Sequence, residues 1–206
     1  MNIIGLIPVR LESSRLPNKA ILEIAKIPMI LHVVRRAQLS QTLDRVVVCT
    51  DSYKICDMCV ENEIEVVLTK STHINGTERI AEAANILNLD DETIIVDIQG
   101  DEPLLRPYMI DNVADYLLKN KAFDIVLPFI EIFGEESHSK VKLVVSGNNV
   151  VYMSRKNVPY PFLKDAIYKK HLSIIAFRMD ALAKFAASKS TPLEAIEGIE
   201  LLRAIE

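Results

Sequence analysis

The sequence predicts an α/β fold with a mixed, mostly parallel sheet and an antiparallel insertion in its second half. Over residues 3–120, short apolar runs typical of strands alternate with amphipathic helical stretches, which is the pattern of strand–helix–strand units in a parallel sheet. After about residue 123, strand-like runs follow one another with little helix between them. The 206 residues hold no repeat, low-complexity tract or linker, so we expect one domain over 1–206, with halves at about 1–122 and about 123–206.

Each expected strand of the first half is nearly all apolar, because both faces of a parallel sheet are buried. The expected strands span residues 3–9, 45–50, 65–68 and 93–98. Each expected helix has apolar residues three or four positions apart, as Ile80, Ala83, Ala84 and Leu87 show. The expected helices are one that begins near residue 28 and three that span 53–62, 77–87 and 108–120.

The second half is expected to hold four strands and two helices. The strands span residues 124–130, 140–145, 150–154 and 171–178, and the helices span 180–187 and 192–206. Gly147-Asn148-Asn149 is a hairpin turn signal between two of these strands. Thr191 before Pro192 and Glu194 predicts a capped start for the last helix.

The composition excludes several classes of protein. A net charge of −4 gives no footprint for binding to nucleic acid, and no apolar run is long enough to cross a membrane. The N-terminus lacks the basic and apolar regions of a signal peptide, so we expect a cytoplasmic protein. The spacing of Cys56 and Cys59 suits a metal pair, but structural zinc needs four ligands, so free buried thiols are the favoured interpretation.

The loop over residues 7–19 follows the first expected strand, where open α/β sheets bind ligands. It carries three cations and two hydroxyl groups: Arg10, Arg15, Lys19, Ser13 and Ser14. Such a set suits a polyphosphate, which needs its charge neutralised and its oxygens hydrogen-bonded. Residue types alone leave a solvated basic loop as the alternative. A Gly-x-Gly-x-x-Gly pattern is absent, which argues against a dinucleotide site.

Three further features carry candidate site residues. Asp101 in the segment 99–103 follows a buried strand and is a candidate Mg²⁺ ligand, or else the cap of a turn. Gly76 in the segment 75–79 lies at a helix start that can receive an anion or a base edge, or that is only capped. His171 is expected to contact substrate and not to transfer a proton, although a lone histidine is more often structural.

Taken in order, these segments resemble the 3-deoxy-manno-octulosonate cytidylyltransferase family. The matching motifs of the first half are IPVRLESSRLPNK at 7–19, PMILHV at 28–33, VVCTD at 47–51, GTERIAE at 76–82 and VDIQGDEP at 96–103. The similarity continues with VKLV at 141–144, Ser154-Arg155, His171-Leu172 and PLEAIE at 192–197. It covers nearly the whole chain, and the ordered set is far more specific than any single motif.

The resemblance implies a Rossmann-like nucleotide-diphospho-sugar transferase fold, with a homodimer built through the antiparallel insertion. The reaction implied joins CMP from CTP to a keto-sugar acid and releases pyrophosphate, with Mg²⁺ as cofactor. The halves would then serve nucleotide binding, and sugar binding with dimerisation. Carried over residue by residue, the resemblance implies that the CTP phosphates are bound by Arg10, Ser13, Ser14, Arg15 and Lys19, and that Gly76 and Arg79 lie by the nucleotide. It implies that Asp101 binds the metal and that the sugar acid is contacted by Gln99, Arg155, His171 and Glu200. Arg15, Lys19 and Asp101 would be catalytic.

The sequence also departs from the family pattern. Asn18 replaces a glycine, and on the sugar side Ile175, Ser173 and Leu201 replace a tyrosine, a glycine and a glutamine. A related sugar acid, such as an 8-amino-8-deoxy analogue or a nonulosonate, is therefore an alternative substrate. The family's later Asp-x-Pro-Glu-Asp segment, with a second metal ligand, does not occur here. Three alternatives follow from its absence. The chain is a truncated form, its second metal site is built otherwise, or it is a non-catalytic CTP-binding homologue. A glycosyltransferase would usually carry Asp-x-Asp instead.

Overall fold

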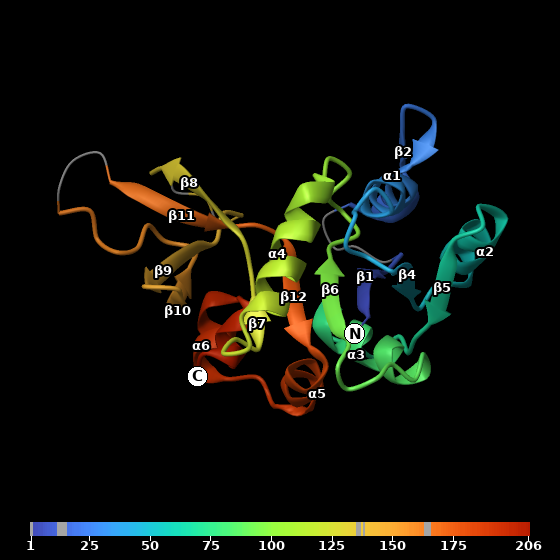
Figure 1. The fold of residues 1–206 in the computed structure, drawn as a ribbon. Helices are drawn as coiled ribbons and strands as arrows, with labels where there is room; N and C mark the ends of the chain where they lie inside the picture. Colours follow the sequence, from blue (N-terminus) through green and yellow to red (C-terminus); the bar gives the residue numbers. More distant parts are fainter. Residues whose placement is uncertain (1, 12–15, 135–136, 138, 163–165) are drawn as a thin grey trace. The chain divides into compact units, whose positions relative to one another are not determined.

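The computed structural model describes residues 2–11, 16–134, 137, 139–162 and 166–206 (Figure 1). The chain divides into two compact units. Unit 1 comprises Met1–Val126 and Ser173–Ala186, and unit 2 comprises Leu127–Leu172 and Ala187–Glu206. The division expected at about residue 122 places 173–186 in the second half, whereas in the structure these residues lie in unit 1. The reason is pairing, because β12 (Ile174–Arg178) adds to β6 (Ile94–Ile98) of the first sheet.

Unit 1 is built on a six-stranded sheet in the order β5-β4-β1-β6-β12-β7. Its remaining strands are β1 (Ile3–Val9), β4 (Arg45–Thr50), β5 (Glu65–Leu68) and β7 (Ile125–Val126). The pairs β5–β4, β4–β1 and β1–β6 are parallel, while β12 runs antiparallel to β6 and to β7. The mixed, mostly parallel sheet predicted from the sequence is therefore confirmed.

Helices cover both faces of this sheet, which is why its strands are nearly all apolar. They are α1 (Met29–Ala37), α2 (Tyr53–Glu61), α3 (Gly76–Ile86), α4 (Pro107–Lys119) and α5 (Met179–Ala187). Alternate strand residues such as Ile7 and Val96 share one core cluster with α1, α2 and α4. Helix α3 contacts β1, β4 and β5, and its buried Ile80 lies outside that cluster, on the opposite face. The sheet is thus the middle layer of unit 1.

Strand β1 lies between β4 and β6, so the chain proceeds from it to one side of the sheet and later returns on the other (Figure 1). The carboxyl ends of β1 and β6 are parallel neighbours, with Leu6 of β1 in register with Asp97 of β6. At such a switch point the connecting loops diverge and leave a crevice, which is where open α/β sheets bind ligands.

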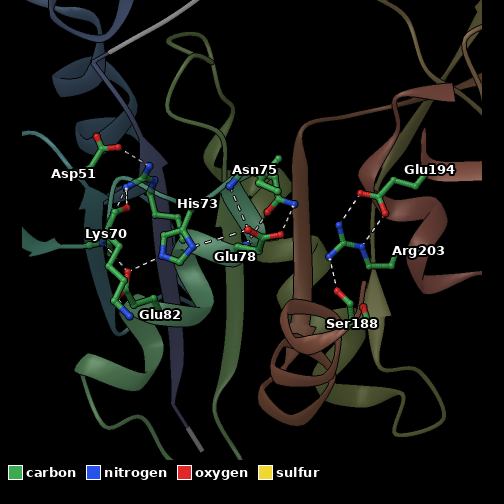
Figure 2. Close-up of polar contacts among 12 residues, drawn as sticks. Asp51, Lys70, His73, Asn75, Glu78, Glu82, Ser188, Glu194 and Arg203 are labelled. Atoms are coloured by element: carbon green, nitrogen blue, oxygen red, sulfur yellow. Dashed lines mark hydrogen bonds and ion pairs between the residues drawn. The ribbon is translucent and has the colours of Figure 1, made fainter. Parts of the chain in front are cut away.

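Unit 2 contains a four-stranded antiparallel sheet in the order β10-β9-β11-β8. Its strands are β8 (Phe129–Phe133), β9 (Lys142–Ser146), β10 (Asn149–Ser154) and β11 (Ile167–His171). The expected hairpin is confirmed, and Gly147 takes a φ of 60° in its turn. Helix α6 (Pro192–Glu197) and the 3-10 helix η2 (Glu200–Ala204) complete the unit. Arg203 joins them by donating two hydrogen bonds to the Glu194 carboxylate, at 2.8 and 2.7 Å (Figure 2).

Three expected elements are wrong because each is interrupted. The strand expected over 124–130 is divided between β7 and β8, since Pro128 has no N–H for a ladder. The strand expected over 171–178 is divided between β11 and β12, which belong to different sheets. The helix expected over 192–206 stops at Glu197, because Gly198 takes the left-handed conformation with a φ of 61°.

One element has no counterpart among the expected ones. A small hairpin of β2 (Glu23–Ile24) and β3 (Ile27–Pro28) precedes α1 and follows the 3-10 helix η1 (Lys19–Ile21). Its turn residues Ala25 and Lys26 both have positive φ, 51° and 67°. Glycine and asparagine usually occupy such positions, so the sequence carries no turn signal there.

All three cysteines are free, with Cys49 and Cys59 buried and Cys56 half-buried. The interpretation as buried free thiols is thus confirmed for Cys59 and holds in part for Cys56. Burial raises the pKa of the Cys59 thiol to about 11, so the group is a neutral thiol at pH 7. Among the described residues, no helix is both long and apolar enough to cross a membrane.

Asp111 of α4 fastens the segment that leads into β4. Its Oδ1 accepts hydrogen bonds from the backbone N–H of Gln41 at 2.9 Å, from Thr42 Oγ1 at 3.0 Å and from Ser40. Burial alone would raise the pKa of Asp111, but these hydrogen bonds outweigh it and hold that pKa below its usual value. The ionised carboxylate is therefore the form that the fold stabilises.

We predict that Asp111→Asn lowers the free energy of unfolding by about 1–3 kcal/mol at pH 7, because hydrogen bonds to a charged acceptor are lost. Since the folded pKa is depressed, this stability is present above the unfolded pKa of about 3.9 and disappears as the pH falls through the folded pKa. Urea unfolding at pH 7 and at decreasing acid pH measures both effects.

The matched control is Asp115→Asn on the same helix, where an exposed pair with Lys119 is expected to contribute less than about 0.5 kcal/mol. Equal losses at the two positions, or an Asp111→Asn deficit that stays constant into acid, would contradict the prediction.

Candidate active site

The carboxyl ends of β1 and β6 border a cavity of about 250 Å³ within unit 1. Residues from three chain segments line it, together with Met29 at the start of α1: Pro8, Val9, Arg10, Lys19 and Ala20 from the first, His73, Ile74, Asn75, Gly76 and Arg79 from the second, and Gln99, Gly100 and Asp101 from the third. The three segments that the sequence singled out therefore meet at one place.

Two glycines allow these segments to approach one another. A Cβ atom on Gly100 would lie 3.0 Å from the carbonyl oxygen of Pro8 and 3.2 Å from Val9 Cβ. A Cβ atom on Gly76 would lie 3.1 Å from Pro8 Cγ. All three distances are shorter than ordinary van der Waals contacts, so a side chain at either position would require its neighbours at the cavity to shift by a few tenths of an ångström.

A cation and a carboxylate face each other at the cavity wall. Asn18 takes the left-handed conformation with a φ of 57° and starts η1, which directs Lys19 toward the end of β6. Lys19 Nζ lies 2.7 Å from Asp101 Oδ2, and the two side chains are 37% and 51% exposed. Such a pair contributes little to stability, so both groups are available to a ligand.

Of the other residues predicted to bind the phosphates, the structure describes only Arg10. Arg10 is exposed and lines the cavity, next to the end of β1. Ser13, Ser14 and Arg15 lie outside the described residues, so their predicted contacts with the phosphates stay predictions.

Arg79 is only 3% exposed and connects three elements. Its guanidinium donates to Asp51 Oδ2 at 2.8 Å, after β4, and to Thr69 Oγ1 at 2.6 Å and Lys70 O at 3.3 Å, after β5. Figure 2 shows the Asp51 and Lys70 contacts beside α3. Arg79 thus places a fixed positive charge at the cavity and holds the first turn of α3 in position.

The start of α3 is held by a second set of polar contacts, shown in Figure 2. Asn75 caps the helix, and its side chain accepts from the Glu78 N–H at 2.8 Å. His73 lies between Glu82, at 2.6 Å from Nε2, and Glu78, at 3.9 Å from Nδ1. Burial would raise the pKa of Glu82, but hydrogen bonds from His73 and from the Lys70 N–H hold it below its usual value.

His73 and Ile74 are cavity residues that the sequence did not indicate. Ile74 is 83% exposed although it lines the cavity, and its N–H donates to Glu78 Oε2 at 3.2 Å. The available signal was position, because both residues directly precede the helix cap Asn75. Residues just before an N-cap lie beside the helix N-terminus and hence beside any anion bound there.

The residues at the cavity suit a metal ion that is bound by one protein carboxylate together with substrate phosphates. The described residues contain no group of three or more histidine, cysteine, aspartate or glutamate side chains that could hold an ion. Asp101 nevertheless offers one partly exposed carboxylate at the cavity. Mg²⁺ commonly takes one or two protein carboxylates and completes its shell with water and substrate phosphates, so this residue set suits it.

The four residues predicted to contact a sugar acid are distributed over both units. Gln99 lies in unit 1 on the cavity wall, while Arg155, His171 and Glu200 lie in unit 2. Glu200 opens η2, and His171 closes β11 instead of opening a strand as expected.

Arg155 directly follows β10 and is held by the end of α6. Its Nε donates to the carbonyl oxygen of Glu197 at 2.9 Å, and its Nη2 donates to that of Gly198 at 2.7 Å. The Glu197 carboxylate accepts from the Arg155 N–H at 3.1 Å and from Ser154 Oγ at 2.7 Å. Burial would raise the pKa of Glu197, but these bonds hold it below its usual value.

Burial lowers the pKa of the His171 ring to about 4, and the positive charge of Lys170 acts in the same direction. The ring is therefore neutral at pH 7. Among the described residues its buried Nδ1 has no hydrogen-bond partner.

A family model described as "Cytidylyltransferase" matches residues 4–206 of the chain. The 3-deoxy-manno-octulosonate cytidylyltransferase of Neisseria gonorrhoeae is 38% identical over 221 residues, which cover 97% of this chain and 84% of that protein. The protein of the same name from a Nitratiruptor species is 36% identical over 206 residues, which cover 97% of this chain and 85% of that protein.

Solved structures agree with these relatives. The CTP complex of a CMP:2-keto-3-deoxy-manno-octonic acid synthetase superposes with a TM-score of 0.90 at 30% identity and covers 100% of this chain and 86% of that chain. A cytidylyltransferase from Leptospira borgpetersenii, at 20% identity and a TM-score of 0.64, covers 97% of this chain and 71% of that chain and is alike in fold alone. The expected nucleotide-diphospho-sugar transferase fold is confirmed, and the chain belongs to the 3-deoxy-manno-octulosonate cytidylyltransferase family.

Proposed function

We propose that this protein transfers the CMP group of CTP to 3-deoxy-manno-octulosonate and releases pyrophosphate. The observation that carries the proposal is the cavity at the ends of β1 and β6, where Lys19 and Asp101 face each other. Relatives that share 97% of the chain's length are cytidylyltransferases by name, which supports the same substrates here.

The reaction forms one bond and breaks one bond at phosphorus. The anomeric hydroxyl oxygen of the sugar acid attacks the α-phosphorus, the bond from that phosphorus to the bridging oxygen breaks, and the hydroxyl proton passes to solvent. Such a transfer needs positioning and charge stabilisation more than covalent catalysis. Lys19, Arg10 and Arg15 would neutralise the phosphates and the leaving pyrophosphate. The N–H groups at Gly76, at the start of α3, would bind an oxygen of the nucleotide.

We also propose Mg²⁺ as cofactor, held by Asp101. When bound, the ion supplies charge neutralisation across the phosphate oxygens. Asp101 would offer its carboxylate to the ion, and the Lys19 ammonium, now 2.7 Å from that carboxylate, would turn to the phosphates. The weakness of an exposed ion pair makes this exchange of partners inexpensive in free energy.

For the sugar acid we propose contacts with Gln99, Arg155, His171 and Glu200. Arg155 would bind the carboxylate, for which a guanidinium fork is suited. His171 would act as a neutral hydrogen-bonding ring, because its pKa of about 4 leaves it uncharged at pH 7. We propose that the reaction takes place in the cytoplasm, where CTP is available, and that it serves lipopolysaccharide biosynthesis.

We further propose a homodimer formed through the sheet of unit 2. Phe133 of β8 and Ile167 of β11 are cross-strand partners and are 74% and 54% exposed. Phe129, further along β8, is 41% exposed. Exposed apolar side chains gathered on one sheet are typical of a protein interface. Light scattering of the purified chain reads the oligomeric state directly.

The proposed function predicts that pyrophosphate appears when the protein is mixed with CTP, Mg²⁺ and 3-deoxy-manno-octulosonate. A coupled pyrophosphate assay measures it, with an 8-amino-8-deoxy analogue and a nonulosonate as competing acceptors and omission of Mg²⁺ as the control. CTP binding without pyrophosphate for any acceptor would indicate a non-catalytic homologue. Release of CMP instead would indicate a glycosyltransferase.

Asp101→Asn is expected to lower the turnover number at least a hundredfold, since one electrostatic contact in such a site is typically worth about 3 kcal/mol of barrier. The unfolding midpoint should stay unchanged, because the carboxylate is half exposed. Asp91→Asn, an exposed position just before β6 at the opposite edge of the sheet, is the control and should keep wild-type turnover. A near-normal rate for Asp101→Asn would remove this residue from the metal site.

Arg155→Ala is expected to raise the KM for the sugar acid at least tenfold while the KM for CTP changes less than twofold. The physical reason is that, of the two substrates, Arg155 would contact only the acceptor, and losing a charge-assisted contact costs about 1.5–3 kcal/mol. The two KM values from one variant control each other. A parallel rise in both would show that the substitution disturbs unit 2 as a whole.

A further inference from the structure

A carboxylate is buried in the centre of the unit 1 sheet. Asp97 of β6 is 1% exposed and lies in register between Leu6 of β1 and Ile175 of β12, both apolar. A carboxylate in such surroundings is costly unless donors satisfy it. Gln99 provides one, because its Nε2 lies 3.2 Å from Asp97 Oδ1 and 3.2 Å from Oδ2.

The sheet places this pair beside the cavity. Strand side chains alternate between faces, and Val96 and Ile98 belong to the core cluster shared with α1, α2 and α4. Asp97 and Gln99 therefore lie on the other face, under α3. A Cβ atom on Gly76, in the first turn of α3, would be 3.7 Å from Gln99 Nε2.

The chemistry of the two groups determines which way the amide is turned. Carboxylate oxygens accept hydrogen bonds, and the Gln99 atom that donates to both oxygens of Asp97 is its amide nitrogen. The carbonyl oxygen Oε1 then points away from Asp97. Within the described part of the chain nothing donates a hydrogen bond to this oxygen, and Gln99 lines the cavity.

We propose that Asp97 is a positioning residue that turns the Gln99 amide so that Oε1 faces the cavity and accepts a hydrogen bond from a hydroxyl group of the acceptor sugar. An oxygen acceptor disfavours phosphate and carboxylate groups, which instead suit the cations Lys19 and Arg10. Gln99 thereby separates the hydroxyl-bearing part of the ligand from its anionic part. The identity of the ligand group rests on the proposed function, whereas the orientation of the amide does not.

The first test reads the orientation without any substrate. Asp97→Leu removes the acceptor, and its circular dichroism spectrum and unfolding midpoint check that the fold persists. In ¹⁵N-labelled protein, the side-chain amide signal of Gln99 is assigned by its loss in Gln99→Glu. We expect its hydrogen exchange to be at least tenfold faster in Asp97→Leu than in the wild type. Equal exchange rates would overturn the inference.

The second test exchanges the two groups. Gln99→Glu alone places two carboxylates face to face and should raise the KM for 3-deoxy-manno-octulosonate at least tenfold. Asp97→Asn combined with Gln99→Glu restores one donor and one acceptor, with an acceptor oxygen still at position 99. We expect this double variant to return within about threefold of the wild-type KM, since a tenfold change corresponds to about 1.4 kcal/mol. A purely structural role of Asp97 would not produce such a rescue.

Gln38→Glu adds the same charge at an exposed position of unit 1 and should leave both KM values unchanged. A double variant no better than Gln99→Glu, or a Gln99→Glu enzyme with wild-type KM, would overturn the inference while the proposed function stands. Wild-type protein that releases no pyrophosphate but shows the expected exchange rates would end the proposed function and leave the orientation intact.

Discussion

The parallel pairing of β1 with β6 is the constraint on which the chemistry of unit 1 depends. It brings Pro8, Val9 and Arg10 beside Gln99, Gly100 and Asp101, although most of unit 1 separates these two segments in the sequence. Gly100 allows the approach, because a Cβ atom there would lie only 3.0 Å from the carbonyl oxygen of Pro8. The cation and the carboxylate of the site thus meet because two strands run in the same direction with their ends in step.

The ion pairs around the cavity have different tasks because their burial differs. The Arg79–Asp51 pair is largely buried, with side chains 4% and 18% exposed, and removing one partner would leave a charge without compensation. The Lys19–Asp101 pair is exposed and weak. The buried pair therefore holds the scaffold, and the exposed pair lies at the cavity wall. Asp97 differs from both pairs. It is a buried acid that we infer orients the neutral Gln99 amide at the cavity.

Much of unit 1 could be predicted because its elements are bounded by local signals. The strands 45–50 and 65–68 are apolar runs closed by polar residues, and the structure has them at the expected bounds. Helix α3 starts one residue earlier than expected, because Asn75 is the cap. The strands 124–130 and 171–178 were wrong because local periodicity does not record a change from one sheet to another.

The residues of the candidate site could also be predicted only in part. Six predicted residues, Arg10, Lys19, Gly76, Arg79, Gln99 and Asp101, line one cavity, because loops at the carboxyl edge of a sheet converge and motifs identify those loops. Asp97 escaped notice because a single acid within an apolar strand gives no periodic signal. The partners of Arg155 at the end of α6 were equally hidden, since they depend on the left-handed turn at Gly198.

The chain leaves the first sheet at β7 and re-enters it at β12, and these two strands are hydrogen-bonded neighbours, with Val126 opposite Ala176. Residues 127–172 are therefore an excursion whose two ends are already joined at its base. Because β7 and β12 pair within the sheet of unit 1, lengthening, shortening or exchanging this excursion would leave the strands of that sheet in register. Evolution and protein engineering could thus alter this segment in length or sequence while the loops that line the cavity of unit 1 keep their places.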